Sequence, residues 1–179
     1  MGKTTDSTDA RMVLDAVRRI VQTLRVSSRA AEREVGVSAA QLFVLERLLA
    51  AKGPLSVGEL ADRTLTHQSS VSVVVQKLER QGLLSRSRSP HDARRVELSL
   101  TPAARALLRK APEAAQDKIL NAVASMPPSS RKPLAELISD LARRVSGGEQ
   151  AAPAMLFEDD QQSSEKTRTG RKVAPRART

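Results

Sequence analysis

Short polar and basic side chains gather on one side of a predicted helix over residues 67–81. Val71, Val74, Val75 and Leu78 recur at three- and four-residue steps and predict the buried face of that helix. Glutamine amides, serine hydroxyls and a lysine ammonium can hydrogen-bond to the base edges of duplex DNA, and such a helix is long enough to cross the major groove. The residues predicted to contact DNA from the opposite face are Gln68, Ser69, Ser70, Ser72, Val73, Gln76 and Lys77.

Two positions on this helix allow more than one interpretation. Val73 would contact a thymine methyl group if its face meets DNA, or it would simply widen the buried stripe. The free backbone N–H groups near Gln68 and Ser69 predict a phosphate site, although the same residues would begin a helix whether or not DNA is present.

A basic hairpin is predicted directly after this helix. Residues 94–100 alternate apolar and polar side chains and predict a half-buried strand, with residues 84–88 as its partner and residues 89–93 as the turn. An arginine from such a hairpin can enter a narrow A·T-rich minor groove. Asp92 is predicted to stabilise the turn by pairing with Arg94. The predicted DNA contacts here are Arg86, Arg88, His91, Arg94 and Arg95; the alternative is a solvated charged hairpin.

Helices are predicted on both sides of these elements. Ser38 and Ser56 each precede a glutamine or glutamate at capping-box spacing, so helices should begin there. Thr66 is predicted to cap the helix at 67–81. Further helices are predicted over residues 9–34, from 102 until a break near Pro112, and over 130–145. The order predicts a mainly α fold in which residues 38–100 form a winged helix-turn-helix lobe, hereafter the winged-helix lobe.

Residues 59–108 resemble the multiple-antibiotic-resistance regulator (MarR) family. The resemblance is carried by Leu78-Glu79-x-x-Gly82-Leu83, by Asp92-x-Arg94 and by Leu100-Thr101-Pro102, and with the flanking helices it covers roughly residues 10–145. It implies a homodimer that binds a palindromic operator, with Arg94 entering the minor groove. It also implies a small lipophilic or phenolic effector, bound in a crevice between the dimerisation region and the DNA-binding lobe. The branch of the family that senses oxidants through cysteine is excluded, because the chain has no cysteine.

Apolar stripes on the first and last helices predict where the two subunits meet. A winged-helix lobe of residues 38–100 is too small to cover both stripes, whereas a second subunit would bury them at a two-fold interface. The alternative is that the two helices pack only within one chain. The predicted dimerisation residues are Leu14, Val17, Val21, Leu24, Leu134, Leu137, Ile138, Leu141 and Val145.

Composition limits the remaining function classes. The 179 residues carry a formal net charge of +10, which favours a polyanionic partner. Two distant histidines and no cysteine predict no metal site and no cofactor, and the absence of a phosphate-binding glycine loop or a catalytic grouping argues against an enzyme. With no signal peptide and no apolar run of membrane-spanning length, we expect a cytoplasmic protein without a membrane partner.

The predicted organisation has three parts. Residues 1–8 are expected to be disordered, residues 9–146 to form the MarR-like domain, and residues 147–179 to form a disordered basic tail. Within the domain, residues 9–34 and 102–146 would supply the dimerisation helices. The predicted function is a sequence-specific transcription regulator, a repressor that acts on double-stranded DNA as a homodimer. The alternative is an architectural or non-specific nucleic-acid-binding protein whose affinity comes from the basic wing and tail.

Overall fold

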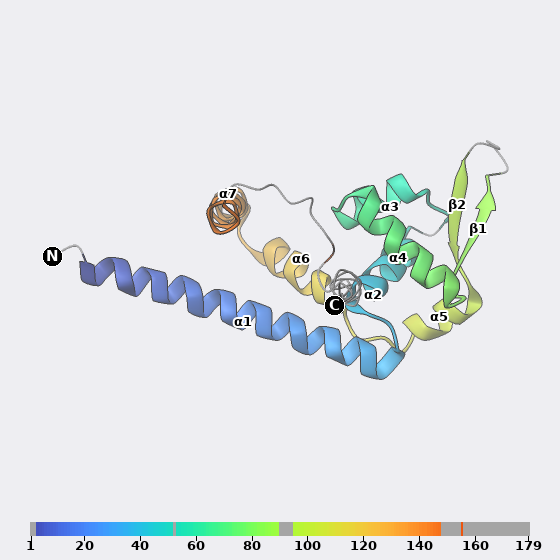
Figure 1. Ribbon diagram of the computed structural model, residues 1–179, viewed down its shortest axis with the longest axis horizontal. Coiled ribbons are helices and arrows are strands. Elements are labelled where there is room, and N and C mark those ends of the chain that lie inside the picture. The colour runs from blue at the N-terminus through green and yellow to red at the C-terminus, as the bar shows by residue number, and fades with distance from the viewer. Residues whose placement is uncertain (1–2, 52, 90–94, 148–154, 156–179) are drawn as a thin grey trace, which may run out of the picture.

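The computed structural model describes residues 3–51, 53–89, 95–147 and 155 of the chain. Figure 1 shows the long helix α1 along one side of the molecule, α6 and α7 beside it, and α2 to α5 with the hairpin at the other end. The described part contains α1 (Lys3–Val35), α2 (Ala39–Ala50), α3 (Val57–Thr64), α4 (Gln68–Arg80), β1 (Leu84–Arg88), β2 (Val96–Leu100), α5 (Pro102–Leu108), α6 (Ala115–Ser125) and α7 (Pro128–Val145).

The predicted helix starts at Ser38, Ser56 and Thr101 are confirmed. The hydroxyls of Ser38 and Ser56 each accept a hydrogen bond from the backbone N–H three residues later. The side chain at that later position, Gln41 or Glu59, accepts one from the backbone N–H of the serine, so both capping boxes are complete. The Thr101 hydroxyl accepts from Ala104 N ahead of α5. The predicted break near Pro112 separates α5 from α6, because proline has no backbone N–H to continue the helix.

Three element boundaries differ from the prediction. Helix α1 begins at Lys3, so residues 3–8 are helical instead of disordered, because an established helix extends at little cost through residues of moderate propensity. Helix α7 begins at Pro128, which places Pro133 inside the helix and beyond its first turn. Thr66 is not the cap of α4, because its hydroxyl lies 2.8 Å from the Thr64 hydroxyl and His67 takes the cap position.

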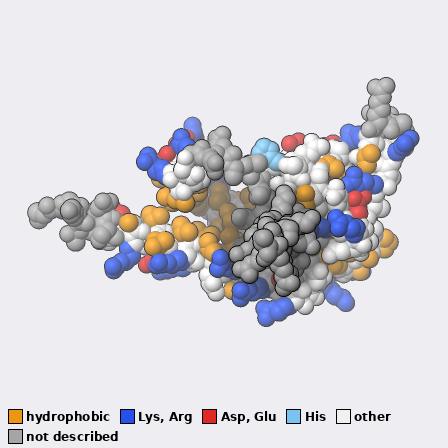
Figure 2. All heavy atoms as spheres, in the orientation of Figure 1, with side chains coloured by type: hydrophobic (Ala, Val, Ile, Leu, Met, Phe, Trp, Pro, Cys, Tyr) orange, Lys and Arg blue, Asp and Glu red, His pale blue; other side chains and the backbone are white. Residues whose placement is uncertain are grey.

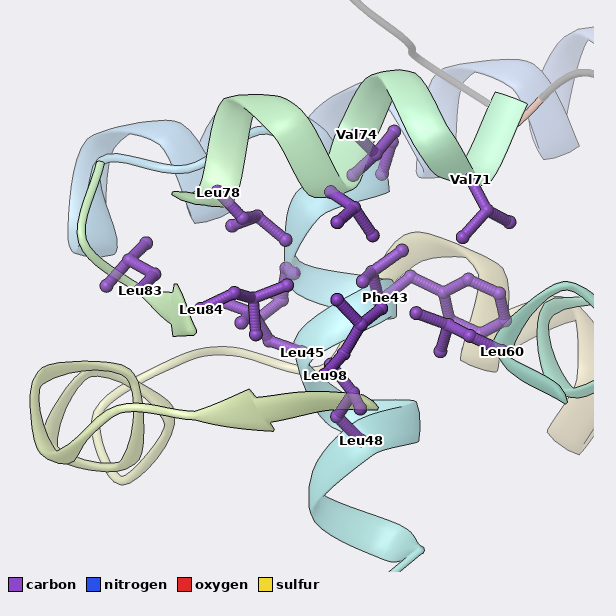
Figure 3. Packing of buried hydrophobic residues seen from close by; sticks show 14 of the residues in the cluster. Phe43, Leu45, Leu48, Leu60, Val71, Val74, Leu78, Leu83, Leu84 and Leu98 are labelled. Atoms are coloured by element: carbon purple, nitrogen blue, oxygen red, sulfur yellow. The ribbon is translucent and has the colours of Figure 1, made fainter. Parts of the chain in front are cut away.

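One core cluster joins the elements of the winged-helix lobe (Figure 3). The predicted inward face of α4 is confirmed, since Val71, Val74, Val75 and Leu78 are at most 1% exposed. Strand β2 pairs antiparallel with β1, from Leu84 opposite Leu100 to Arg88 opposite Val96. The side chains that fill the centre of this cluster include Leu42, Leu45, Leu48, Leu60, Leu83, Leu84 and Leu98.

The hairpin projects beyond this core. Leu98 is fully buried, whereas Val96, predicted to face inward, is 41% exposed because its end of the strand lies past the packed layer. Leu55 and Leu98 exchange two backbone hydrogen bonds of 3.1 and 2.8 Å and so fasten β2 to the segment before α3. The wing is therefore anchored at its base, close to the helix-turn-helix.

One residue described beyond α7 lies in the core. Met155 is 4% exposed and belongs to the main core cluster, although it lies in the stretch predicted to be a disordered tail. In the described part of the chain, no helix combines the length and the apolar character needed to cross a membrane.

Candidate nucleic-acid interface

Helix α4 lies beside the hairpin (Figure 1). Most of its polar side chains are exposed or half-buried. Gln68, Ser69 and Gln76 are exposed, and the side chains of Ser70, Ser72 and Lys77 are half-buried. The Ser72 hydroxyl donates to the Gln68 carbonyl at 2.8 Å, which occupies one of the groups predicted to reach a base. The amides at the two ends of this face are thus the most accessible of the predicted contacts.

Val73 is half-buried. Part of its surface packs beside the buried stripe and part remains open to solvent. Both interpretations of this residue, contact with a thymine methyl group and a widened core face, therefore stay open.

The turn between α3 and α4 is short and tightly held. Leu65 adopts a left-handed conformation with φ of +55°, and Thr66 N donates to the Ala61 carbonyl at 3.1 Å. The Thr64 hydroxyl donates to the Leu60 carbonyl at 2.9 Å. His67 provides no side-chain cap, so α4 begins without the hydroxyl acceptor that α2, α3 and α5 have. Backbone N–H groups at a helix start that lack a capping side chain can donate hydrogen bonds to a phosphate oxygen.

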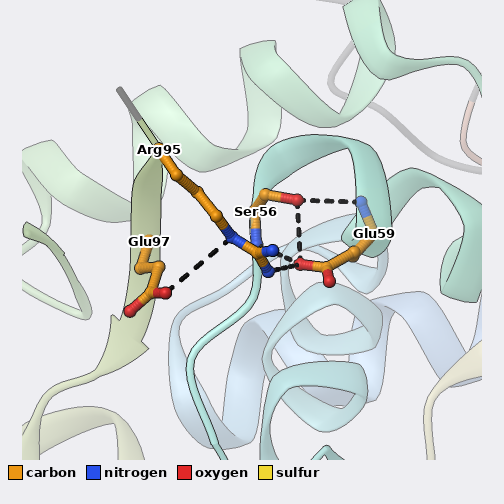
Figure 4. A network of polar contacts seen from close by, with 4 residues as sticks. All are labelled: Ser56, Glu59, Arg95 and Glu97. Carbon is orange, nitrogen blue, oxygen red and sulfur yellow. Dashed lines mark hydrogen bonds and ion pairs between the residues drawn. The ribbon is translucent and has the colours of Figure 1, made fainter. Parts of the chain in front are cut away.

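Two of the arginines predicted to contact DNA are paired with acidic residues of the helix-turn-helix. Arg86 Nε on β1 lies 2.5 Å from Glu79 Oε1 on α4. Arg95 Nη2 lies 2.5 Å from Glu59 Oε2 on α3, and Arg95 Nε lies 3.8 Å from Glu97 Oε1 (Figure 4). Both side chains join the wing to the helices in the DNA-free chain, and contact of Arg86 and Arg95 with DNA stays a prediction.

The remaining wing residues divide into two groups. Arg88 is exposed at the far end of β1, where a phosphate could reach it. His91, Asp92 and Arg94 lie outside the described residues. The pairing of Asp92 with Arg94 and the insertion of Arg94 into the minor groove therefore stay predictions.

The predicted dimerisation residues lie on α1 and α7, and most of them are accessible. Leu14, Val17 and Val21 are between 38 and 49% exposed, and Leu137 and Val145 are 70 and 80% exposed. Ile138 is also exposed, and Leu134 and Leu141 are half-buried. Leu24 is an exception: at 6% exposure it packs with Ala39 and Ala115 in its own chain, so it belongs to the core.

An apolar cavity of about 590 Å³ separates the two helices. Ile20 and Leu24 of α1, Ile119 of α6, and Leu134 and Ile138 of α7 line it, with Arg19, Lys118 and Arg131 at its margin. In Figure 2 hydrophobic side chains of α1 gather on the side that faces α6 and α7. This apolar groove is open in a single chain.

Glu46, Arg47 and Asp117 form a charged cluster where α2 meets α6, and no local pattern in the sequence predicted it. Arg47 Nη2 lies 2.6 Å from both Asp117 carboxylate oxygens, and its guanidinium lies 4.8 Å from the centre of the Phe43 ring. Burial raises the pKa of Glu46 to about 8, assisted by a hydrogen bond to Asp117 and by the Asp117 charge. Seventy residues separate Arg47 from Asp117, so neither helical spacing nor a motif could have predicted this contact.

Residues 35–95 match the sequence model of the MarR family. The HTH-type transcriptional repressor MdtR of Bacillus subtilis is 41% identical to this chain over 66 residues. This segment of the chain is therefore similar to the MarR family. The MdtR match covers 37% of this chain and 42% of MdtR, so the chain spans less than half the length of this curated relative.

Solved structures show a likeness in fold that includes the flanking helices. A MepR-like protein complexed with pseudoligands has a TM-score of 0.53 at 20% identity, covering 78% of this chain and 97% of that chain. The organohalide-sensing regulator RdhR-CbdbA1625, in its 2,4-dichlorophenol-bound form, has a TM-score of 0.53 at 17% identity, covering 85% and 90%. These likenesses establish the MarR fold: a winged-helix lobe with helices from both chain ends. In the described residues, no group of three or more His, Cys, Asp or Glu side chains could hold a metal ion.

Proposed function

We propose that this chain is a sequence-specific transcription regulator that represses by binding a palindromic operator as a homodimer. The arrangement of α4 carries the proposal. Val71, Val74, Val75 and Leu78 are buried in the lobe core. Gln68, Ser69 and Gln76 are exposed beside a basic hairpin. At 13 residues α4 is about 20 Å long, which suits the major groove.

The exposed apolar faces of α1 and α7 support the dimer. The two helices come from opposite ends of the sequence and leave apolar side chains uncovered, which a second copy of the chain would bury. A two-fold axis through this region would place the two α4 helices about 34 Å apart, one turn of DNA.

The cavity among these helices supports an effector, but it is lined by α1, α6 and α7 and not by the winged-helix lobe, so it differs from the crevice predicted between the dimerisation region and that lobe. The RdhR-CbdbA1625 structure contains 2,4-dichlorophenol, and we extend a small lipophilic or phenolic effector to this chain. An apolar cavity of about 590 Å³ has the volume and lining that such ligands need. Arginine and lysine at its margin would favour a phenolate or another weak acid.

Selection from a random-sequence duplex pool tests the proposal directly. A sequence-specific dimer enriches one palindrome and binds it at least about 10³-fold more tightly than unselected duplex of equal length. Equal affinity for both duplexes would contradict sequence-specific regulation. The experiment needs no knowledge of the operator.

The basic tail motivates the second candidate, a non-specific nucleic-acid-binding protein. Replacing Lys166, Arg168, Arg171, Lys172, Arg176 and Arg178 with glutamine distinguishes the two while leaving Met155 in place. A regulator keeps its preferred duplex and loses only a salt-sensitive part of its affinity. Loss of nearly all binding to every duplex would support the architectural function instead.

A further inference from the structure

Ion pairs hold the wing on both of its strands. Arg86 on β1 pairs with Glu79 of α4, and Arg95, the residue before β2, pairs with Glu59 of α3. The hairpin is thus tied separately to each helix of the helix-turn-helix. The backbone bridge between Leu55 and Leu98 lies further down β2, at the base of the wing. Among the described residues, the Arg95–Glu59 pair ties the end of β2 that is remote from this bridge to α3.

The acceptor of this pair is itself held in place. Glu59 Oε2 accepts hydrogen bonds from Ser56 N at 2.8 Å and from the Ser56 hydroxyl at 2.9 Å (Figure 4). Glu59 is also the returning side chain of the capping box at the start of α3. Its carboxylate therefore has a defined position before Arg95 arrives, so the guanidinium meets a preformed site.

Hydrogen bonding keeps this acceptor charged. Bonds from the Ser56 backbone N–H and hydroxyl, and then from Arg95, lower the pKa of Glu59 to about 2. Glu59 is consequently ionised at any pH at which the protein would meet DNA. The pair is also exposed, with about two fifths of each side chain accessible, so it gives little net stability to the fold as a whole.

We propose that Arg95 and Glu59 form a latch that sets the orientation of the wing on α3, and that Arg95 is a positioning residue instead of a DNA contact. The inference rests on the proposed function, since it concerns how the same interface reaches DNA. The guanidinium points from the hairpin toward α3, and its shorter ion-pair contact is with Glu59. Glu97, 3.8 Å away, holds the other side of the guanidinium.

The latch and a phosphate contact predict opposite effects of removing Glu59. An acidic side chain at a DNA interface repels phosphate, so a direct contact by Arg95 would be strengthened by Glu59→Gln. The latch predicts weaker binding, because the wing loses its fixed orientation. Glutamine can still fill the capping box, as Gln41 does at the start of α2, so this variant removes the charge and leaves the helix start intact.

Hydrogen–deuterium exchange in the DNA-free protein is the decisive measurement. Exchange of the wing amides in residues 84–88 and 96–100 should rise about two- to fivefold in Glu59→Gln and in Arg95→Gln, the range expected for losing an exposed ion pair. Glu136→Gln on α7 makes the same charge change at a distant exposed ion pair and should leave the wing unchanged. Unchanged wing exchange in both test variants would overturn the latch, whatever the DNA results show.

Binding to the duplex that the unmodified protein selects completes the test. The two single variants and the double variant should all lose the same affinity, since either change opens the latch. The slope of log affinity against log salt should stay the same. A further loss in the double variant, with a slope reduced by about one charge, would make Arg95 a phosphate contact and overturn the proposal. Failure to select any duplex, with wing exchange raised as expected, would contradict the regulator function alone.

Discussion

Arg47 of α2 holds Asp117 of α6 through one guanidinium nitrogen that lies 2.6 Å from both carboxylate oxygens. This pair joins the winged-helix lobe to the helices that carry the predicted dimer interface. The Arg47 and Asp117 side chains are 26% and 14% exposed, and Glu46 adds a second carboxyl group beside them. One guanidinium therefore lies near two carboxyl groups, and the protonated form of Glu46 is favoured.

The first prediction concerns pH. Burial, and then the hydrogen bond and charge of Asp117, raise the pKa of Glu46 from 4.5 to about 8 in the folded chain. Between these values the folded chain binds more protons at this site than the unfolded chain. The contribution of Glu46 to the free energy of unfolding should therefore be largest below pH 4.5, fall as pH rises to about 8, and level off above it. Urea denaturation between pH 5 and 9 measures this slope.

Glu46→Gln should remove that slope, because glutamine resembles the protonated acid and does not titrate. Glu136→Gln, an exposed acid paired with Lys132, is the matched control and should retain it. A wild-type slope in Glu46→Gln would mean that Glu46 is ionised in the folded protein.

The second prediction removes the other acid. Asp117→Asn deletes the charge that Arg47 holds and leaves the guanidinium three-quarters buried without its counter-ion. We expect a loss of about 1–3 kcal/mol in the free energy of unfolding at pH 7. The pKa of Glu46 should fall at the same time, since Asp117 is among the causes that raise it. Chemical denaturation at pH 6 and pH 9 tests both effects, and equal stability to the wild type at both values would contradict them.

The fold followed from sequence wherever the determining contacts are local. The residues of each capping box, Ser38 with Gln41 and Ser56 with Glu59, lie three positions apart, so each box forms within one helical turn. The valine spacing of α4 likewise predicted its buried face. The helix starts, the wing strands and the order of the elements could be predicted for this reason.

Contacts between distant segments were not predictable in the same way. Glu59 and Arg95 are 36 residues apart, and their pairing depends on how the hairpin leans against α3. Leu24 belongs to an apolar stripe with Val17 and Val21, but periodicity shows only which side of a helix is apolar. Whether that side meets its own chain or a second copy depends on where α2 and α6 lie, and Leu24 alone falls against them.

The third prediction concerns base recognition by α4. Gln76→Ala should relax the preference at one base pair of the selected duplex, at about 1–3 kcal/mol, because an alanine cannot make two hydrogen bonds to adenine. Gln76 is exposed, so the fold should be unaffected. Selection repeated with the variant measures the preference at each position. Gln22→Ala on α1 removes an exposed amide outside the winged-helix lobe and should retain the original preference. A uniform loss at all positions would make Gln76 a backbone contact.

The last prediction concerns the apolar faces of α1 and α7. Leu137 is 70% exposed on α7 in a single chain, so Leu137→Glu should hardly change how one chain folds. In a dimer the same position would be buried, and an unpaired carboxylate there would be costly. We expect the variant to sediment as a monomer at concentrations where the wild type is a dimer, and to lose most of its affinity for a palindrome while keeping weak binding to a half-site. Leu24→Ala is the contrasting variant, because Leu24 is buried within its own chain: it should lower the melting temperature and leave the dimer intact. A Leu137→Glu protein that remains dimeric would show that the two subunits meet elsewhere.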